Sequence, residues 1–112
     1  YAGITKGFQA LGTAMIMGAE RNGAFDAFVE ELGASQVPLA AWLRKQLPTM
    51  YAKAYRWDGE MREIAKFLEP EKGSAMMLTG AAELYVHVAH DNQEGPSSEI
   101  ISTLERFVQA GK

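Results

Sequence analysis

The sequence has no cysteine, few prolines and no long apolar run, and each absence excludes a class of protein. Without cysteine among its 112 residues, the chain can form neither a disulfide framework nor a thiolate metal site, which is typical of the reducing cytoplasm. No apolar run approaches the roughly 20 residues that span a bilayer, so we expect no membrane association. The 11 basic and 14 acidic residues give a net charge of −3, which disfavours a nucleic-acid-binding surface.

The residues that are present predict an all-α fold. The hydrophobic content of 47% with 22% charged residues is typical of one globular domain with one core. Apolar residues recur at steps of three and four through almost the whole chain, as in amphipathic helices. The expected helices cover about residues 1–21, 25–33, 35–47, 48–69, 74–91 and 97–110. We therefore expect a single multihelical domain of about five to six helices over residues 1–112.

Local signals predict where several of these helices begin and end. Asn22-Gly23 suits a helix C-terminus, Ser35 suits the N-terminal cap of the third helix, and Pro48 suits the first turn of the fourth. Gly59, in the middle of the fourth helix, predicts a close helix approach or a bend. Pro70 ends that helix.

The periodic apolar residues predict which side of each helix faces the core. The cleanest seam, in the fourth helix, consists of Met50, Ala54, Trp57, Met61, Ile64 and Leu68. In the fifth helix the expected core residues are Met77, Ala81, Leu84 and Val88. On the outer face of the fourth helix, charges of opposite sign such as Arg56 and Glu60 stand one turn apart and can pair.

The first helix is unusual because its apolar periodicity begins within the first residues of the chain. No initiator Met and no capping residue precede it, so we expect this helix, and the protein, to begin upstream of Tyr1. One stripe of this helix is apolar and consists of Ile4, Phe8, Leu11 and Met15. A second ridge is made of small residues, where two helices could pack closely: Gly3, Gly7, Ala14 and Gly18.

Lys6 is the first candidate for chemistry. The small residues around it leave room for a ligand, and Gln9 and Thr13 offer polar groups on nearby turns. A lysine on a helix is also commonly a solvated surface charge, and small residues also suit plain helix packing. If an anion is held elsewhere, Lys53 and Arg56, one turn apart beside aromatic residues, are the best candidates.

Other kinds of site have weaker support. His87 and His90 lie one turn apart with Glu83 and Asp91 nearby, but one helix rarely supplies every metal ligand, so we expect no metal. No Gly-rich phosphate loop follows a strand, and no Ser-His-Asp or Cys-His set is present.

Two stretches resemble a known family. Residues 1–11, running on to Ala19-Glu-Arg-Asn-Gly, are similar to the helix that opens the C-terminal domain of the 6-phosphogluconate and 3-hydroxyacid dehydrogenase superfamily. Lys-Ala-Tyr-Arg-Trp-Asp-Gly-Glu-Met-Arg-Glu-Ile-Ala, residues 53–65, resembles a signature of its DUF1932 branch. In that superfamily a Rossmann domain binds NAD or NADP, and an all-helical domain closes the cleft and builds much of a dimer.

The resemblance implies a role for Lys6 and a set of partners. The family's catalytic lysine, in a Gly-x-x-Lys setting, falls on Lys6. A lysine amine can take the hydroxyl proton of a small hydroxy acid only in its neutral form, which desolvation and a nearby positive charge favour. The implied partners are an N-terminal Rossmann domain absent from this chain, a second copy in a homodimer, and a small hydroxy-acid substrate. NAD or NADP would be held mainly by the missing domain, and none is expected on these residues alone.

The chain also departs from the family pattern. Ala10 stands where the family often has a substrate-binding Asn, and Glu60-Met61 stands where better-known members have Lys-Asp. We therefore do not infer the substrate of this chain from characterised members of the family. The candidate substrate contacts are Gln9, Thr13, Arg56 and Glu60. The alternative hypothesis is a stand-alone helical homodimerisation module without catalytic activity.

Overall fold

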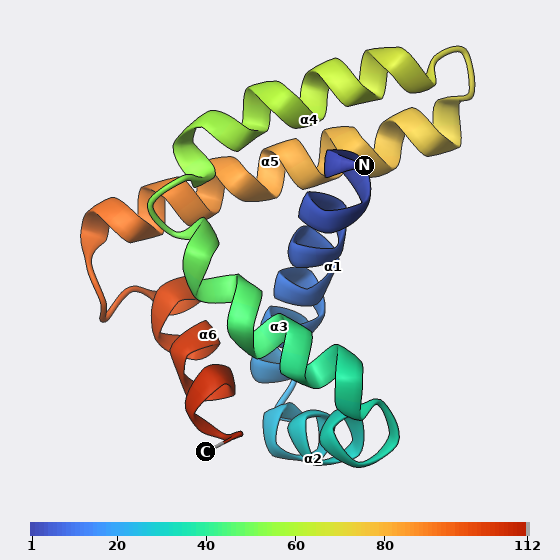
Figure 1. Ribbon diagram of the computed structural model, residues 1–112. Coiled ribbons are helices and arrows are strands. Elements are labelled where there is room, and N and C mark those ends of the chain that lie inside the picture. The colour runs from blue at the N-terminus through green and yellow to red at the C-terminus, as the bar shows by residue number, and fades with distance from the viewer. Residues whose placement is uncertain (112) are drawn as a thin grey trace.

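The computed structural model describes residues 1–111 and contains six α-helices, with no strand among those residues (Figure 1). The helices are α1 (Ala2–Arg21), α2 (Phe25–Ser35), α3 (Val37–Met50), α4 (Ala54–Leu68), α5 (Lys72–Glu94) and α6 (Glu99–Gln109). The predicted all-α fold of five to six helices is confirmed. None of the helices in the described part of the chain has the length and apolar character needed to span a membrane.

The long antiparallel hairpin of α4 and α5 forms one side of the molecule (Figure 1). Helices α1, α3 and α6 pack beneath it, and α2 lies at the far end, where it joins α1 to α3. The core lies where these helices meet and includes fully buried side chains from five of them: Ile16, Met17, Leu47, Met50, Met61, Tyr85, Val88, Leu104 and Phe107. This arrangement holds α1 against α5 along one side.

The predicted seam of α4 is confirmed, but the helix begins later than expected. Trp57 and Met61 are buried, and Ile64 packs against the core. Pro48, however, lies inside α3, which continues to Met50. Leu47 and Met50, on either side of this proline, are both fully buried. Their burial, worth about 1.5–3 kcal/mol for each side chain, offsets the penalty of about 3 kcal/mol for an internal proline.

Two further helix-end predictions differ from the structure, and one agrees. Ser35 ends α2, because its hydroxyl donates to the Glu31 carbonyl at 2.7 Å, and Gln36 precedes α3 instead. Helix α5 begins at Lys72, because the Glu71 carboxylate accepts the backbone N–H groups of Gly73 and Ser74. Gly23 follows α1 with φ of +71°, which confirms the predicted turn.

Gly59 was expected to mark a close helix approach or a bend, and Met77 was expected to face the core; the close approach and the burial of Met77 are both absent from the described residues. A Cβ added to Gly59 would have no heavy atom of the described residues within 4 Å, so no helix approaches closely there. Met77 is 73% exposed although Ala81 and Val88, on the same side of α5, are buried. Met77 lines an open apolar groove between α1 and α5, so α1 leaves its side chain uncovered.

Candidate functional site

The amine of Lys6 lies between α1 and α4. Its Nζ donates a hydrogen bond to Glu60 Oε1 at 2.6 Å, across 54 positions of sequence. The Lys6 side chain is 21% exposed and the Glu60 side chain 43% exposed, so the pair lies at the edge of the fold and remains open to solvent on one side. An amine in this position can be reached by a molecule or a domain that covers the open side.

Two aromatic rings form the inner wall of this site. The Lys6 Nζ lies 4.7 Å from the centroid of the Trp57 ring, within the range of a cation–π contact. Trp57 in turn packs edge-on against Tyr85, with ring centroids 5.4 Å apart. The indole therefore shields one side of the amine from water.

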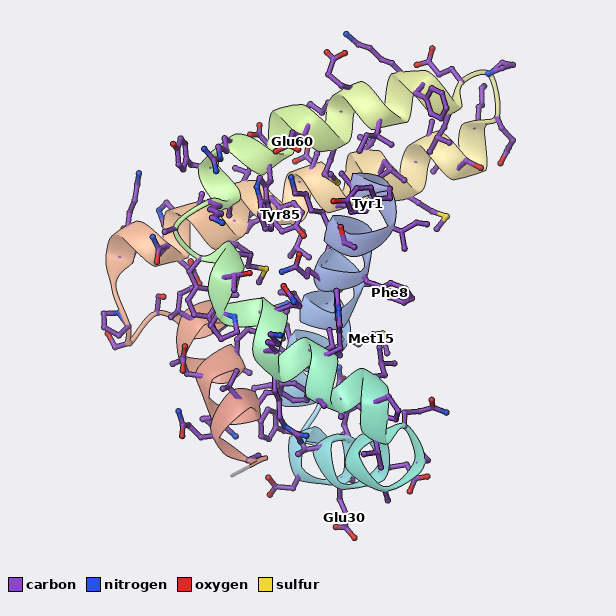
Figure 2. All side chains as sticks on the ribbon, in the orientation of Figure 1. Tyr1, Phe8, Met15, Glu30, Glu60 and Tyr85 are labelled. Carbon is purple, nitrogen blue, oxygen red and sulfur yellow. The ribbon has the colours of Figure 1, made fainter. Side chains whose placement is uncertain are left out.

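Tyr85 also anchors the backbone beneath the amine. Its ring is fully buried, and its hydroxyl donates a hydrogen bond to the Lys6 carbonyl. Burial raises the pKa of the Tyr85 phenol, so the hydroxyl remains a donor. Figure 2 shows Glu60 and Tyr85 coming from α4 and α5 toward the region beside α1. Both the backbone and the side chain of Lys6 are thus held by partners on other helices.

The local sequence explains how α1 comes so close to α4. A Cβ added to Gly3 would lie 3.3 Å from Ile64 Cγ2, so glycine permits the tight approach one turn before Lys6. On α4, Trp57 and Glu60 are one turn apart, which places a buried ring and an exposed carboxylate on neighbouring positions of one helix face.

Gln9 and Thr13, predicted as substrate contacts, point into the protein. Gln9 Nε2 donates to the Gln46 carbonyl at 2.9 Å, and Thr13 Oγ1 donates to the Gln9 carbonyl at 2.8 Å. Both side chains are buried, and the Gln9 amide joins α1 to α3. The structure therefore does not bring them to the open side of Lys6.

Arg56 is exposed on α4, one turn before Glu60. The predicted pairing of these two residues along the helix is not what the structure has, because Glu60 bonds Lys6 instead. The Arg56 guanidinium lies on the outer surface near the site and is available to a ligand. Lys53, the other anion candidate, is also exposed and precedes α4.

Sequence reasoning did not identify Trp57 and Tyr85 as parts of the site. The spacing predicted Trp57 as a core residue of the fourth helix, but not its contact with the Lys6 amine. The available signal was chemical: a buried tyrosine requires a partner for its hydroxyl, but the sequence alone does not name the Lys6 carbonyl as that partner.

The histidines do not assemble a metal-binding cluster within residues 1–111. His90 lies 3.5 Å from both Asp91 and Glu94. Asp91 Oδ2 accepts a hydrogen bond from the Ile100 backbone N–H at 2.9 Å, so this carboxylate binds the N-terminal end of α6.

The comparisons with known proteins identify one family. The model described as "Domain of unknown function (DUF1932)" matches residues 19–88, well over half of the chain. This domain is found in the C-terminal part of 3-hydroxyacid dehydrogenase-like proteins. The match includes Trp57, Glu60 and Tyr85 but begins after Lys6. No curated protein and no solved structure matches the chain.

Proposed function

The chain belongs to the DUF1932 family, and from this premise we propose that it is the C-terminal helical domain of an NAD(P)-dependent oxidoreductase acting on a small hydroxy acid. The observation that carries the proposal is the Lys6 amine, held by Glu60 and Trp57 and open to solvent on one side. We propose Lys6 as the residue that transfers the proton at the substrate oxygen. The absence of cysteine agrees with a cytoplasmic enzyme.

The chemistry requires one proton and one hydride to leave the alcohol. When bound, the nucleotide supplies the hydride acceptor. Lys6 first passes a proton to the Glu60 carboxylate; as the hydride leaves carbon, the resulting amine takes the hydroxyl proton, and a carbonyl forms. In the reverse direction the Lys6 ammonium returns the proton to the carbonyl oxygen. Glu60 Oε1, at 2.6 Å, orients the amine and is the nearest group that can exchange a proton with it.

The described residues suit one wall of such a site and not the nucleotide-binding half. They form helices only, so they lack the strand-turn-helix element that cradles a dinucleotide phosphate. The proposal therefore places NAD or NADP mainly on an N-terminal Rossmann domain of a longer protein. That domain would cover the open side of Lys6 and exclude water, which strengthens the electrostatic interactions there.

The charges of Glu60 and Arg56 would affect the orientation of a bound substrate. A substrate carboxylate beside Glu60 would meet a like charge, which is unfavourable at a partly desolvated site. The exposed Arg56 guanidinium, one turn away on α4, offers the opposite charge. We propose that the substrate directs its hydroxyl toward Lys6 and its carboxylate toward Arg56.

The test is a screen of the intact protein against small 2- and 3-hydroxy acids, with NAD⁺ and NADP⁺, following nucleotide reduction. Reduction with at least one acid, which is lost in Lys6→Met and retained in Lys66→Met, supports the proposal. Lys66 is a suitable control because it is an exposed lysine on α4. Activity that survives Lys6→Met would remove this residue from catalysis.

A second test uses the 112-residue chain itself. Because the phosphate-binding element is expected elsewhere, calorimetric titration with NADH and NADPH should give no micromolar binding. Micromolar affinity of this chain for either nucleotide would contradict the proposal that NAD or NADP binds mainly to an N-terminal Rossmann domain.

A further inference from the structure

A cavity of about 420 Å³ opens where α1, α5 and α6 meet. Met17 and Ile100, which are buried, and the half-buried Leu84 form its apolar part. Cavities that hold small molecules usually have about 300–1,000 Å³, with apolar walls and a few polar groups that fix the ligand. This cavity therefore has the size and the apolar walls of a small-molecule site.

Four polar side chains from the same three helices complete the lining. They are Arg21 from α1, His87 and Asp91 from α5, and Glu99 from α6. One guanidinium and two carboxylates bring charges of both signs to one space. A ligand that matches this lining carries a negative group and a positive group beside an apolar body.

The Asp91 carboxylate is held in position by the start of α6. Its Oδ2 accepts a hydrogen bond from the Ile100 backbone N–H at 2.9 Å, and its side chain is only 19% exposed. Its Oδ1 lies 3.5 Å from His90 Nδ1, which is longer than a normal hydrogen bond. Because the carboxylate is already fixed, it loses little freedom when Oδ1 accepts a hydrogen bond from a ligand.

Arg21 and Glu99 form an ion pair at the solvent edge of the cavity, and it joins α1 to α6. The Arg21 Nε donates to Glu99 Oε1 at 2.8 Å, and the two side chains are 60% and 59% exposed. Water screens so exposed a pair, so separating it costs little. A molecule with one negative and one positive group can replace it, because a carboxylate can bind the guanidinium with two parallel hydrogen bonds and an ammonium can bind Glu99.

We propose that this cavity binds a free α-amino acid with an apolar side chain. The ligand carboxylate binds Arg21, and its ammonium lies between Glu99 and Asp91. Its side chain packs against Met17 and Leu84. A simple anion would meet two carboxylates in the same space, and a simple amine would make no use of the guanidinium.

The proposed site is separate from the candidate site. Arg21 follows Lys6 by 15 positions of sequence, which is about 22 Å along a helix at about 1.5 Å per residue. A ligand in the cavity would leave the Lys6 amine open. The inference does not depend on the dehydrogenase role, because the cavity and its charges exist whatever Lys6 does.

The experiment is a titration of the isotope-labelled 112-residue chain with L-leucine, followed by the amide signals in NMR spectra. We expect saturable shifts centred on the residues that line the cavity, with a dissociation constant in the millimolar range. Two analogues separate the charges: isoamylamine lacks the carboxylate of leucine, and isocaproate lacks its ammonium. Each should bind at least about tenfold more weakly than leucine, because each loses a charge-assisted hydrogen bond.

One variant removes the guanidinium and keeps most of the side chain. Arg21→Met should weaken leucine binding by about tenfold or more. Arg62→Met is the matched control, because Arg62 also forms an exposed ion pair between two helices, with Glu83 at 3.0 Å, and lies outside the cavity. This control should bind leucine as the wild type does. The NMR spectra of both variants report whether the fold is kept.

A second variant tests the other half of the ion pair. Glu99→Gln releases Arg21 from its partner, so isocaproate should bind more tightly than to the wild type while leucine binds more weakly. The proposal would be overturned if leucine caused no saturable shifts, or if all three compounds bound the wild type equally. Leucine affinity that is unchanged in both Arg21→Met and Glu99→Gln would also overturn it.

Discussion

The two sides of α1 are opposite in character. The inner side buries Ile16 and Met17 in the core, and near its start the polar groups are held: Lys6 by Glu60 and Trp57, and the Lys6 carbonyl by Tyr85. The outer side has the large apolar residues and leaves them in solvent. A soluble helix normally has polar residues on its outer side. The comparison teaches that the inner contacts of α1 are complete, whereas its outer side remains apolar and exposed within the described residues.

The largest expected effect on stability lies on the inner side. Tyr85→Ala should destabilise the fold by about 3–5 kcal/mol, because it removes a fully buried ring that packs against Trp57. Urea denaturation followed by circular dichroism measures the change. Tyr85→Phe keeps the ring and loses only the bond to the Lys6 carbonyl, so it should cost about 1 kcal/mol. Equal losses in both variants would contradict the packing role of the ring.

A pair of glycine substitutions contrasts a packed position of α1 with an open one. In Gly12→Ala the new Cβ would lie 2.7 Å from Cδ2 of the buried Leu43. Overpacking of about 1–3 kcal/mol should exceed the helical gain of about 0.5–1 kcal/mol and give a net loss near 1 kcal/mol. Thermal and urea denaturation of the variant measure this loss. If Gly12→Ala is neutral, α1 and α3 are less tightly packed than the structure shows.

The matched substitution at the open position should change stability with the opposite sign. Gly7→Ala adds a Cβ into open space, so it should stabilise the isolated chain by about 0.5–1 kcal/mol. Urea denaturation followed by circular dichroism measures the change. A fall in the free energy of unfolding would show that this position of α1 is covered within one chain.

The smallest expected effect concerns the ion pair. Glu60→Gln should change the free energy of unfolding by less than about 1 kcal/mol, because the pair is partly exposed and solvent screens it. The difference between wild type and variant should shrink at high salt, and denaturation at low and high ionic strength checks this. A large difference that is independent of salt would mean that Glu60 has a packing role.

The sequence predicted the helices and the core side of α4 well, because periodicity over several turns reports burial directly. It failed at Pro48, where burial of Leu47 and Met50 outweighs the local penalty of proline. It also failed at Met77, whose position fits the core pattern although its side chain lies in an open groove between α1 and α5. Such features depend on how the helices are placed in space and not on local spacing.

The candidate site was predictable only in part. Family resemblance identified Lys6, and alignment drew attention to Glu60, which the structure places 2.6 Å from the amine. Gln9 and Thr13 were chosen for their nearness along the helix, but they point toward α3. Trp57 and Tyr85 contribute through contacts between helices far apart in sequence, which spacing along one helix does not reveal.

The most direct test of the central claim is the turnover number of the intact protein with Lys6 replaced by Met. The account predicts a fall of about 10²–10⁴-fold, the usual contribution of a positioned acid or base, with the free energy of unfolding nearly unchanged and Lys66→Met at wild-type turnover. Wild-type turnover in Lys6→Met would contradict the account.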